Sequence, residues 1–454
     1  MVTRLLPAAL CAGAGLLGGC NFMVYDDLAD EAWVDRVERP SSTNSRQYGE
    51  ALVATPTRGA GTNIVVIGKS RASISQLQYD DEGKRQSILA VDPRQTLSFA
   101  SFPDNPALAV DADSDRIAFT VVQGDNKDPT RIAVYDGRNL GSAPVKSVVL
   151  TPMLDVNGTM RHNIYAEGIT FANLPGFGTD GDDLVVTRGP QLVVIQDYEQ
   201  PDGPGSSFLI NGCLHGDDWS YGVTVADILP DETNPGPEII FGTGAEIKNG
   251  ASQVLVVAPS VVSTPHTAAG DCLAPTPALL TLTSAEDARD LGSVVTHAQF
   301  PDVPDGDPAA GLADLIYSAP SINKVFVRFG GGTAVEIYPG EAGSDFGDSI
   351  ATGDLDDDGV PELVIGAPRS DPEGVTNAGA AYVYKFRPTP TPGFDLVATL
   401  HPGEPQNEER FGKSVAIAPF GTEGRNILVI GADGEVFTYF RTTLYEDVRA
   451  RRAP

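Results

Sequence analysis

The chain has 454 residues, with 61 acidic side chains against 31 basic ones, which gives a formal net charge of −30 at pH 7. This charge excludes a nucleic-acid binder that works by neutralising phosphates. Glycine (49) and proline (35) are too frequent for a helical bundle, and 41% hydrophobic residues are too many for a disordered chain. The composition therefore predicts an all-β protein with many turns.

The first residues, MVTRLLPAALCAGAGLLGGC, are typical of an export signal, with Arg4 before an apolar segment that ends in small residues. The ending Leu17 to Cys20 resembles the lipobox of bacterial lipoproteins, which implies cleavage before Cys20 and acylation of its thiol. An ordinary signal peptide is the alternative. We therefore expect a lipoprotein signal peptide at 1–19, a tether at 20–45 and a lipid anchor in the bacterial cell envelope. Asn21 favours the outer membrane.

Two further cysteines, Cys213 and Cys272, remain once the signal has left and Cys20 is acylated. In an oxidising, exported setting a pair of cysteines most simply forms one disulfide. Two buried free thiols are the alternative. The sequence has no CxxC spacing that would predict a zinc or redox site.

A repeated pattern begins after the tether. Its clearest copy, Phe346 to Phe386, has an aromatic-glycine start, an acidic loop, a strand over 362–365 closed by Gly-Ala-Pro, and an alternating strand over 380–386. A second copy at 411–440 keeps the frame and loses the acidic loop. Weaker copies begin near Tyr48, Leu97, Gly168, Tyr221 and Gly292, so the frame recurs seven times, about every 60 residues.

Each repeat offers short strands bounded by turn residues, as expected for one four-stranded antiparallel sheet. Such a sheet cannot bury both faces alone, and radial packing of several sheets around an axis solves this problem. We therefore predict a seven-bladed β-propeller over residues 46–440, followed by a tail at 441–454. Two packed β-sandwiches are the alternative, although they would not produce a common frame of this length.

The segment FGDSIATGDLDDDGVPELVIGAP, residues 346–368, resembles an FG-GAP repeat, the unit of the integrin α-chain propeller. The resemblance extends in weaker form over about residues 45–440. It implies an all-β, seven-bladed β-propeller of FG-GAP/integrin α type, with calcium held in loops on one face and partner binding on the opposite face. Leg domains like those of integrins are not recognisable in this chain, so the resemblance concerns the integrin head.

The acidic loop of the clearest copy carries the strongest chemical signal. Alternating oxygen ligands in a tight loop converge on one point, and a glycine at 359 permits the bend. The predicted Ca²⁺ ligands are Asp354, Asp356, Asp358, the Val360 carbonyl and Glu362. The loop is not an EF-hand, because position twelve is Ile365 and the flanking segments are strands. A solvated acidic turn is the alternative.

A weaker candidate metal loop has the same alternation at Asp111, Asp113 and Asp115, but Arg116 replaces the bending glycine. Acidic clusters at 180–183 and 302–307 have irregular spacing, and we interpret them as polar turns. They are weaker candidates for metal binding than the loops with alternating aspartates.

Signals of catalysis are weak. Gly347-Asp348-Ser349 lacks the last glycine of a nucleophile elbow, and the five histidines show no metal-binding spacing. The leading hypothesis is a surface-anchored, calcium-binding, non-enzymatic propeller that binds a protein or glycan in adhesion, as a monomer, with no nucleic-acid partner. One alternative is an extracellular polysaccharide lyase or hydrolase with its site in the propeller funnel. The other is a structural component of an outer-membrane assembly.

Overall fold

A computed structural model of the chain describes residues 33–38 and most of 49–440. Within 49–440, it leaves out 50, 57–61, 69–72, 80–84, 92–106, 112–115, 123–129, 138–139, 141–142, 151–152, 155–159, 162–165, 176–181, 189–190, 197, 199–207, 214–219, 231–235, 244–251, 263–277, 285, 287, 302–310, 331, 333, 340, 389–391 and 421–424. No helix in the described part is long and apolar enough to cross a membrane.

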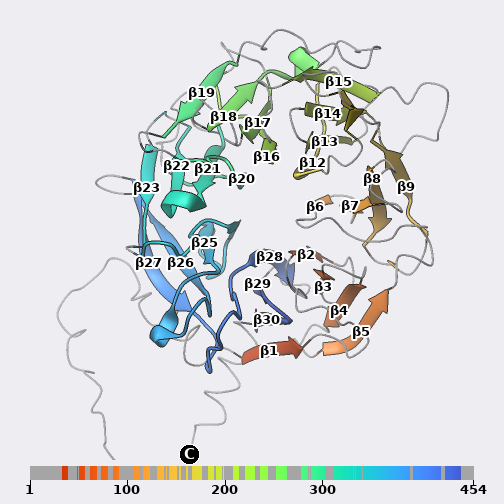
Figure 1. Cartoon of the computed structure of the whole chain (residues 1–454). Helices are drawn as coiled ribbons and strands as arrows, with labels where there is room; N and C mark the ends of the chain where they lie inside the picture. Colours follow the sequence, from red (N-terminus) through yellow and green to blue (C-terminus); the bar gives the residue numbers. More distant parts are fainter. Residues whose placement is uncertain are drawn as a thin grey trace, which may run out of the picture.

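The described strands form seven four-stranded antiparallel sheets and one two-stranded pair, arranged in a ring (Figure 1). This arrangement confirms the predicted all-β propeller. Each sheet begins with the strand nearest the axis. Six sheets follow chain order: the first contains β2 (Ala51–Pro56), β3 (Thr62–Gly68), β4 (Ser73–Tyr79) and β5 (Arg85–Val91), and the second contains β6 (Leu108–Asp111), β7 (Arg116–Val122), β8 (Thr130–Asp136) and β9 (Lys146–Val149). The third sheet contains β12 (Gly168–Ala172), β13 (Asp183–Arg188), β14 (Gln191–Ile195) and β15 (Phe208–Cys213), and the fourth contains β16 (Ser220–Ala226), β17 (Glu238–Thr243), β18 (Gln253–Val257) and β19 (Leu280–Thr283). The fifth sheet contains β20 (Val295–Ala298), β21 (Asp314–Ala319), β22 (Lys324–Arg328) and β23 (Ala334–Ile337), and the sixth contains β24 (Ser349–Gly353), β25 (Glu362–Ala367), β26 (Ala380–Arg387) and β27 (Gly393–Leu400). The two-stranded pair is β10 (Met153–Leu154) with β11 (Met160–Arg161).

The seventh sheet joins the two ends of the described chain. It contains β28 (Ser414–Phe420), β29 (Arg425–Ala432) and β30 (Glu435–Phe440), and its fourth strand is β1 (Trp33–Glu38), antiparallel to β30. Arg36 of β1 pairs with Glu435 of β30 and lies 5.6 Å from the ring centre of Phe437. The N-terminal strand thus closes the ring at its C-terminal sheet.

This closure corrects the predicted domain boundaries. The tether expected at 20–45 contains β1, so the propeller begins before residue 46. The physical reason is that the last repeat supplies three strands, and its sheet needs a fourth to cover the backbone edge of β30. A strand outside the repeat frame provides it.

The core lies between the sheets. Seven apolar clusters are present in the described residues, and each joins side chains of two neighbouring sheets. The second strand of a sheet is therefore covered on both faces, and in β25 every residue is buried. This explains why these strands are continuous apolar runs, in contrast to the alternation seen in half-exposed strands.

The aromatic-glycine and Gly-Ala-Pro elements of the repeat meet where two sheets touch near the axis. A Cβ atom at Gly366 would lie 2.0 Å from the carbonyl oxygen of Gly412 in the next sheet. Ser349 donates a hydrogen bond of 2.8 Å to that same oxygen, and Ser414 donates one of 2.6 Å to the carbonyl of Gly49. The motif residues thus allow neighbouring backbones to approach closely and join them by hydrogen bonds.

Candidate functional site: an acidic loop

The acidic loop connects β24 to β25 inside the sixth sheet. It turns sharply because Asp357 and Gly359 have positive φ angles of 57° and 83°. Glycine adopts this conformation without steric cost, and aspartate tolerates it better than most residues. The expected role of Gly359 in the bend agrees with this backbone.

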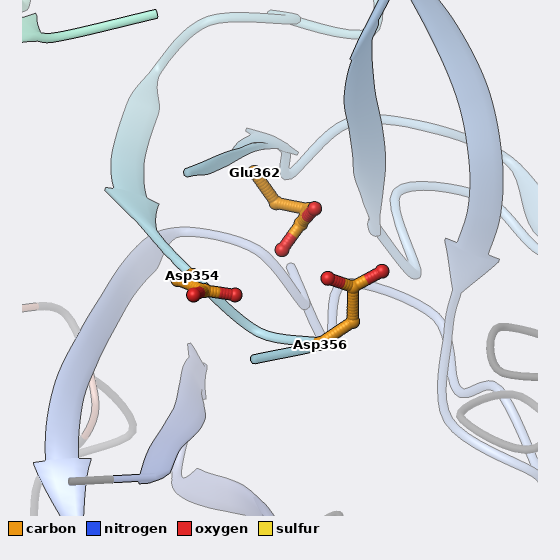
Figure 2. Close-up of side chains that lie close together, drawn as sticks. All are labelled: Asp354, Asp356 and Glu362. Carbon is orange, nitrogen blue, oxygen red and sulfur yellow. The ribbon is translucent and has the colours of Figure 1, made fainter. Parts of the chain in front are cut away.

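Three predicted ligands come together in this loop. Asp354, Asp356 and Glu362 each offer a carboxylate oxygen, and these oxygens lie within 4.8 Å of one another. Figure 2 shows the three carboxylates directed toward a common point. Calcium binds oxygen ligands at about 2.3–2.6 Å, so ligands on one ion are at most about 5 Å apart. The three carboxylates therefore fit a divalent cation.

Asp358 differs from the prediction. Its Oδ2 accepts a 2.6 Å hydrogen bond from Lys385 Nζ, and the same amine donates a 2.5 Å bond to Asp356 Oδ2. The Asp356 side chain is only 2% exposed. Asp358 Oδ1 also accepts the N–H of Val360, whose carbonyl remains a predicted ligand. Asp358 is thus held by an ammonium group and lies outside the group of three.

The charges in this contact shift two pKa values. Burial acts to lower the pKa of Lys385, but the hydrogen bonds that its amine donates to Asp356 and Asp358 outweigh it and the pKa is raised. For Asp358, burial acts to raise the pKa, while the hydrogen bonds from Lys385 and the Val360 N–H outweigh it and the pKa is lowered. Both groups are therefore held in their charged forms.

Sequence analysis did not identify Lys385. The strand pairing accounts for its position. Leu363 of β25 is opposite Tyr384 of β26, so one residue further along the antiparallel pair Lys385 lies beside Glu362. A lysine at that position of the third strand lies next to the loop.

Asp354 shapes the loop as well as facing the group of three. Its carboxylate accepts the N–H groups of Asp358 at 3.2 Å and Gly359 at 2.7 Å. Its backbone carbonyl accepts a 2.7 Å hydrogen bond from Asn426 on β29 of the next sheet. The loop is thus tied to the neighbouring sheet and pre-shaped around Asp354.

Glu362 belongs to a series that recurs around the ring. It is the first residue of β25, it is fully buried, and its Oε2 accepts the Leu355 N–H at 2.7 Å. The first residues of β13, β17 and β21 accept loop N–H groups in the same way, and these are Asp183 (from Leu174), Glu238 (from Ile228) and Asp314 (from Phe300). The carboxylate at this position therefore fixes the turn between the first two strands of a sheet, a role that sequence analysis missed.

A second candidate region is the channel along the ring axis. A cavity of about 310 Å³ is lined by the first strands of all seven sheets. Glu167 lines it, and burial raises the pKa of this carboxyl to about 7. Asp348 and Lys413 also line it and form a 2.7 Å ion pair across two sheets. The cavity thus presents one carboxyl that titrates near neutral pH.

The histidines that the structure describes make local contacts. His297 Nδ1 is 2.8 Å from the Thr224 hydroxyl. His401 Nδ1 is 2.9 Å from the carbonyl of Pro402. Neither belongs to a metal-binding group among the described residues.

Several predicted site residues lie outside the described part of the chain. These are Cys20, Cys272, Asp113 and Asp115, together with the side chain of Cys213. Asp111 is described at the end of β6, where it is 7% exposed and opposite Arg116. The lipid anchor, the disulfide and the weaker metal loop stay predictions.

Comparison with protein families identifies one repeat. The model of the FG-GAP repeat matches residues 346–384, which contain the acidic loop, Gly366 and most of β26. The chain thus contains an FG-GAP repeat.

Comparison with solved structures concerns the fold alone. The crystal structure of BBS1N in complex with ARL6DN, soaked with lead, has a TM-score of 0.51 at 11% identity, over 90% of this chain and 95% of that chain. The mercury-soaked form has a TM-score of 0.51 at 12% identity, over 91% and 97%. A catalytically inactive virginiamycin B lyase from Staphylococcus aureus has a TM-score of 0.49 at 10% identity, over 90% and 99%, which carries no functional argument. The chain is a β-propeller with an FG-GAP repeat.

Proposed function

We propose that the protein is a lipid-anchored, seven-bladed propeller of FG-GAP/integrin α type that binds a protein or glycan without catalysis. Each four-stranded sheet is one blade, and Ca²⁺ stabilises the loop of the sixth blade. The observation that carries the proposal is the convergence of Asp354, Asp356 and Glu362 inside the matched repeat. The proposed adhesion at the cell envelope rests on the family resemblance.

Calcium is the cation that this loop favours. The group consists of hard carboxylate oxygens in an irregular turn, which suits the flexible coordination of Ca²⁺ better than the octahedral geometry of Mg²⁺. The ion would be held by Asp354, Asp356 and Glu362, and it would offset the repulsion between their charges. Its role is structural, because the loop joins two strands and is tied to the next blade through Asn426.

A thermal melt in excess Ca²⁺ and in chelator tests the calcium loop. An ion that binds only the folded state adds about 2.7 kcal/mol at a hundredfold excess over Kd. For a domain of this size the expected rise in Tm is about 3 °C. Asp356→Asn should abolish most of this rise. Asp357→Asn is the matched control, because Asp357 is exposed and lies outside the group of three. No difference between Ca²⁺ and chelator for the wild type refutes the calcium loop.

The anchor needs a separate test. Cys20→Ala expressed in a bacterial host should lose labelled palmitate and move to the aqueous phase of a detergent partition, because acylation of that thiol is the proposed membrane attachment. Unchanged membrane partition of the variant contradicts the lipoprotein proposal.

The axial channel is where the enzymatic alternative would have its site. Glu167 supports this alternative, because a carboxyl with a pKa of about 7 can accept or donate a proton at neutral pH. The non-enzymatic proposal predicts that the protein does not shorten cell-surface polysaccharides. Cleavage of a bound polysaccharide that is lost in Glu167→Gln would favour the alternative.

A further inference from the structure

Lys385 of β26 supplies a positive charge to the acidic loop. Its amine donates to Asp356 at 2.5 Å and to Asp358 at 2.6 Å, and its side chain is 21% exposed. Asp356 belongs to the group of three that fits a divalent cation. One carboxylate therefore faces both the ammonium group and the candidate metal position.

We propose that Lys385 is an internal competitor of the divalent cation, which holds the loop together without the ion and lowers the affinity of the loop for it. The proposal rests on the calcium loop proposed above. A nearly buried carboxylate such as Asp356 needs a compensating positive charge, and either the ammonium group or the ion can supply it. Two positive charges side by side repel each other, so binding of the ion displaces the amine.

A second acceptor for the displaced amine lies one strand away. Lys385 of β26 is directly opposite Asp395 of β27 in the antiparallel register. Asp395 is exposed and pairs with Arg387, so its carboxylate is open to solvent and accessible to a long side chain. The four-carbon stem of a lysine can move between neighbouring acceptors. The amine can thus leave the loop without losing a carboxylate partner.

The competition predicts two effects of opposite sign when the charge is removed. In Lys385→Met the carboxylates lose their internal cation, so the protein without metal should melt at a lower temperature. The same variant should bind Ca²⁺ about tenfold more tightly, because the ion no longer displaces a charge-assisted pair. A merely structural lysine would lower stability without raising affinity for the ion.

The experiment is calorimetric titration of the intact protein with Ca²⁺, together with melts in Ca²⁺ and in chelator. Lys324→Met is the matched control, because Lys324 also bridges two carboxylates, Glu286 and Glu336, on a different blade. The control should leave the Ca²⁺ affinity unchanged. Tighter binding by Lys385→Met, with a larger Ca²⁺-dependent rise in Tm than the wild type, is the expected result.

The outcomes separate this inference from the proposed function. If the wild type binds Ca²⁺ and Lys385→Met binds it equally or more weakly, the competition is refuted while the calcium loop stands. If neither protein binds Ca²⁺, both proposals fail, because the variant is the form most favourable to the ion. If only the variant binds, the competition is supported, while the calcium loop proposed for the wild type fails.

Discussion

Replacing Gly366 by alanine tests the physical basis of the repeat. The added Cβ would lie 2.0 Å from the carbonyl oxygen of Gly412 and 2.3 Å from the hydroxyl of Ser349. A backbone carbonyl of the adjoining blade cannot move without shifting that blade. The substitution also disturbs the hydrogen bond from Ser349 to Gly412. Neighbouring blades should therefore separate near the axis.

The expected cost follows from two contributions. Overpacking a tight contact costs about 1–3 kcal/mol, and a weakened hydrogen bond adds about 1 kcal/mol. A total near 3 kcal/mol corresponds to a fall in Tm of about 4 °C in a domain of this size.

The assay is a thermal melt of Gly366→Ala beside Gly403→Ala. A Cβ at Gly403 meets no atom within 4 Å, so this control adds the same methyl group without a clash. The control should melt close to the wild type. If Gly366→Ala melts within 1 °C of the control, close backbone approach is not what the glycine provides.

Three further predictions concern other parts of the chain. Asp314→Asn should destabilise the protein by about 2 kcal/mol, because Asp314 is buried and accepts N–H groups from both Phe300 and Gly330, and the Ca²⁺-dependent rise in Tm should stay unchanged. An effect of Asp314→Asn on Ca²⁺ binding would contradict the structural role of that carboxylate. The folded-state pKa of Glu167, about 7, exceeds its ordinary value of 4.5, so its contribution to stability is full below pH 4.5 and is lost as pH rises through 7. In denaturant melts, the free energy of unfolding of Glu167→Gln relative to the wild type should be up to about 3 kcal/mol higher at pH 8 than at pH 5. An equal difference at both pH values contradicts the raised pKa. Exported protein should yield a disulfide-linked peptide pair of Cys213 and Cys272 in mass spectrometry without reduction, and two alkylated thiols contradict the bridge.

The propeller fold could be predicted from the sequence because its frame is local. Gly347 precedes β24, Gly366 lies near the end of β25, and the apolar run of β25 marks a strand covered on both faces. The strands expected at 362–365 and 380–386 are β25 and β26. The first strand, β1, could not be predicted, because its pairing with β30 joins residues some 400 positions apart and depends on the open edge left by a three-stranded last repeat.

The acidic loop could be predicted only in part, for a similar reason. Alternation along the loop identified Asp354, Asp356 and Glu362, since these residues follow one another in the turn. The position of Asp358 depends on Lys385, which comes from a strand 27 residues further along. A ligand pattern within one loop contains no information about a competing cation from a neighbouring strand.

Comparison between the blades separates the two functions of the acidic residues. A carboxylate at the first position of the second strand accepts a loop N–H through a direct hydrogen bond in four blades. The role of Glu362 in the turn therefore does not require a metal. The alternating aspartates Asp354 and Asp356 are additions to that turn in the sixth blade, and with them comes Lys385. The repeat thus supplies a turn already stabilised by one buried carboxylate, and the additional aspartates create the charge that only a lysine or an ion can offset.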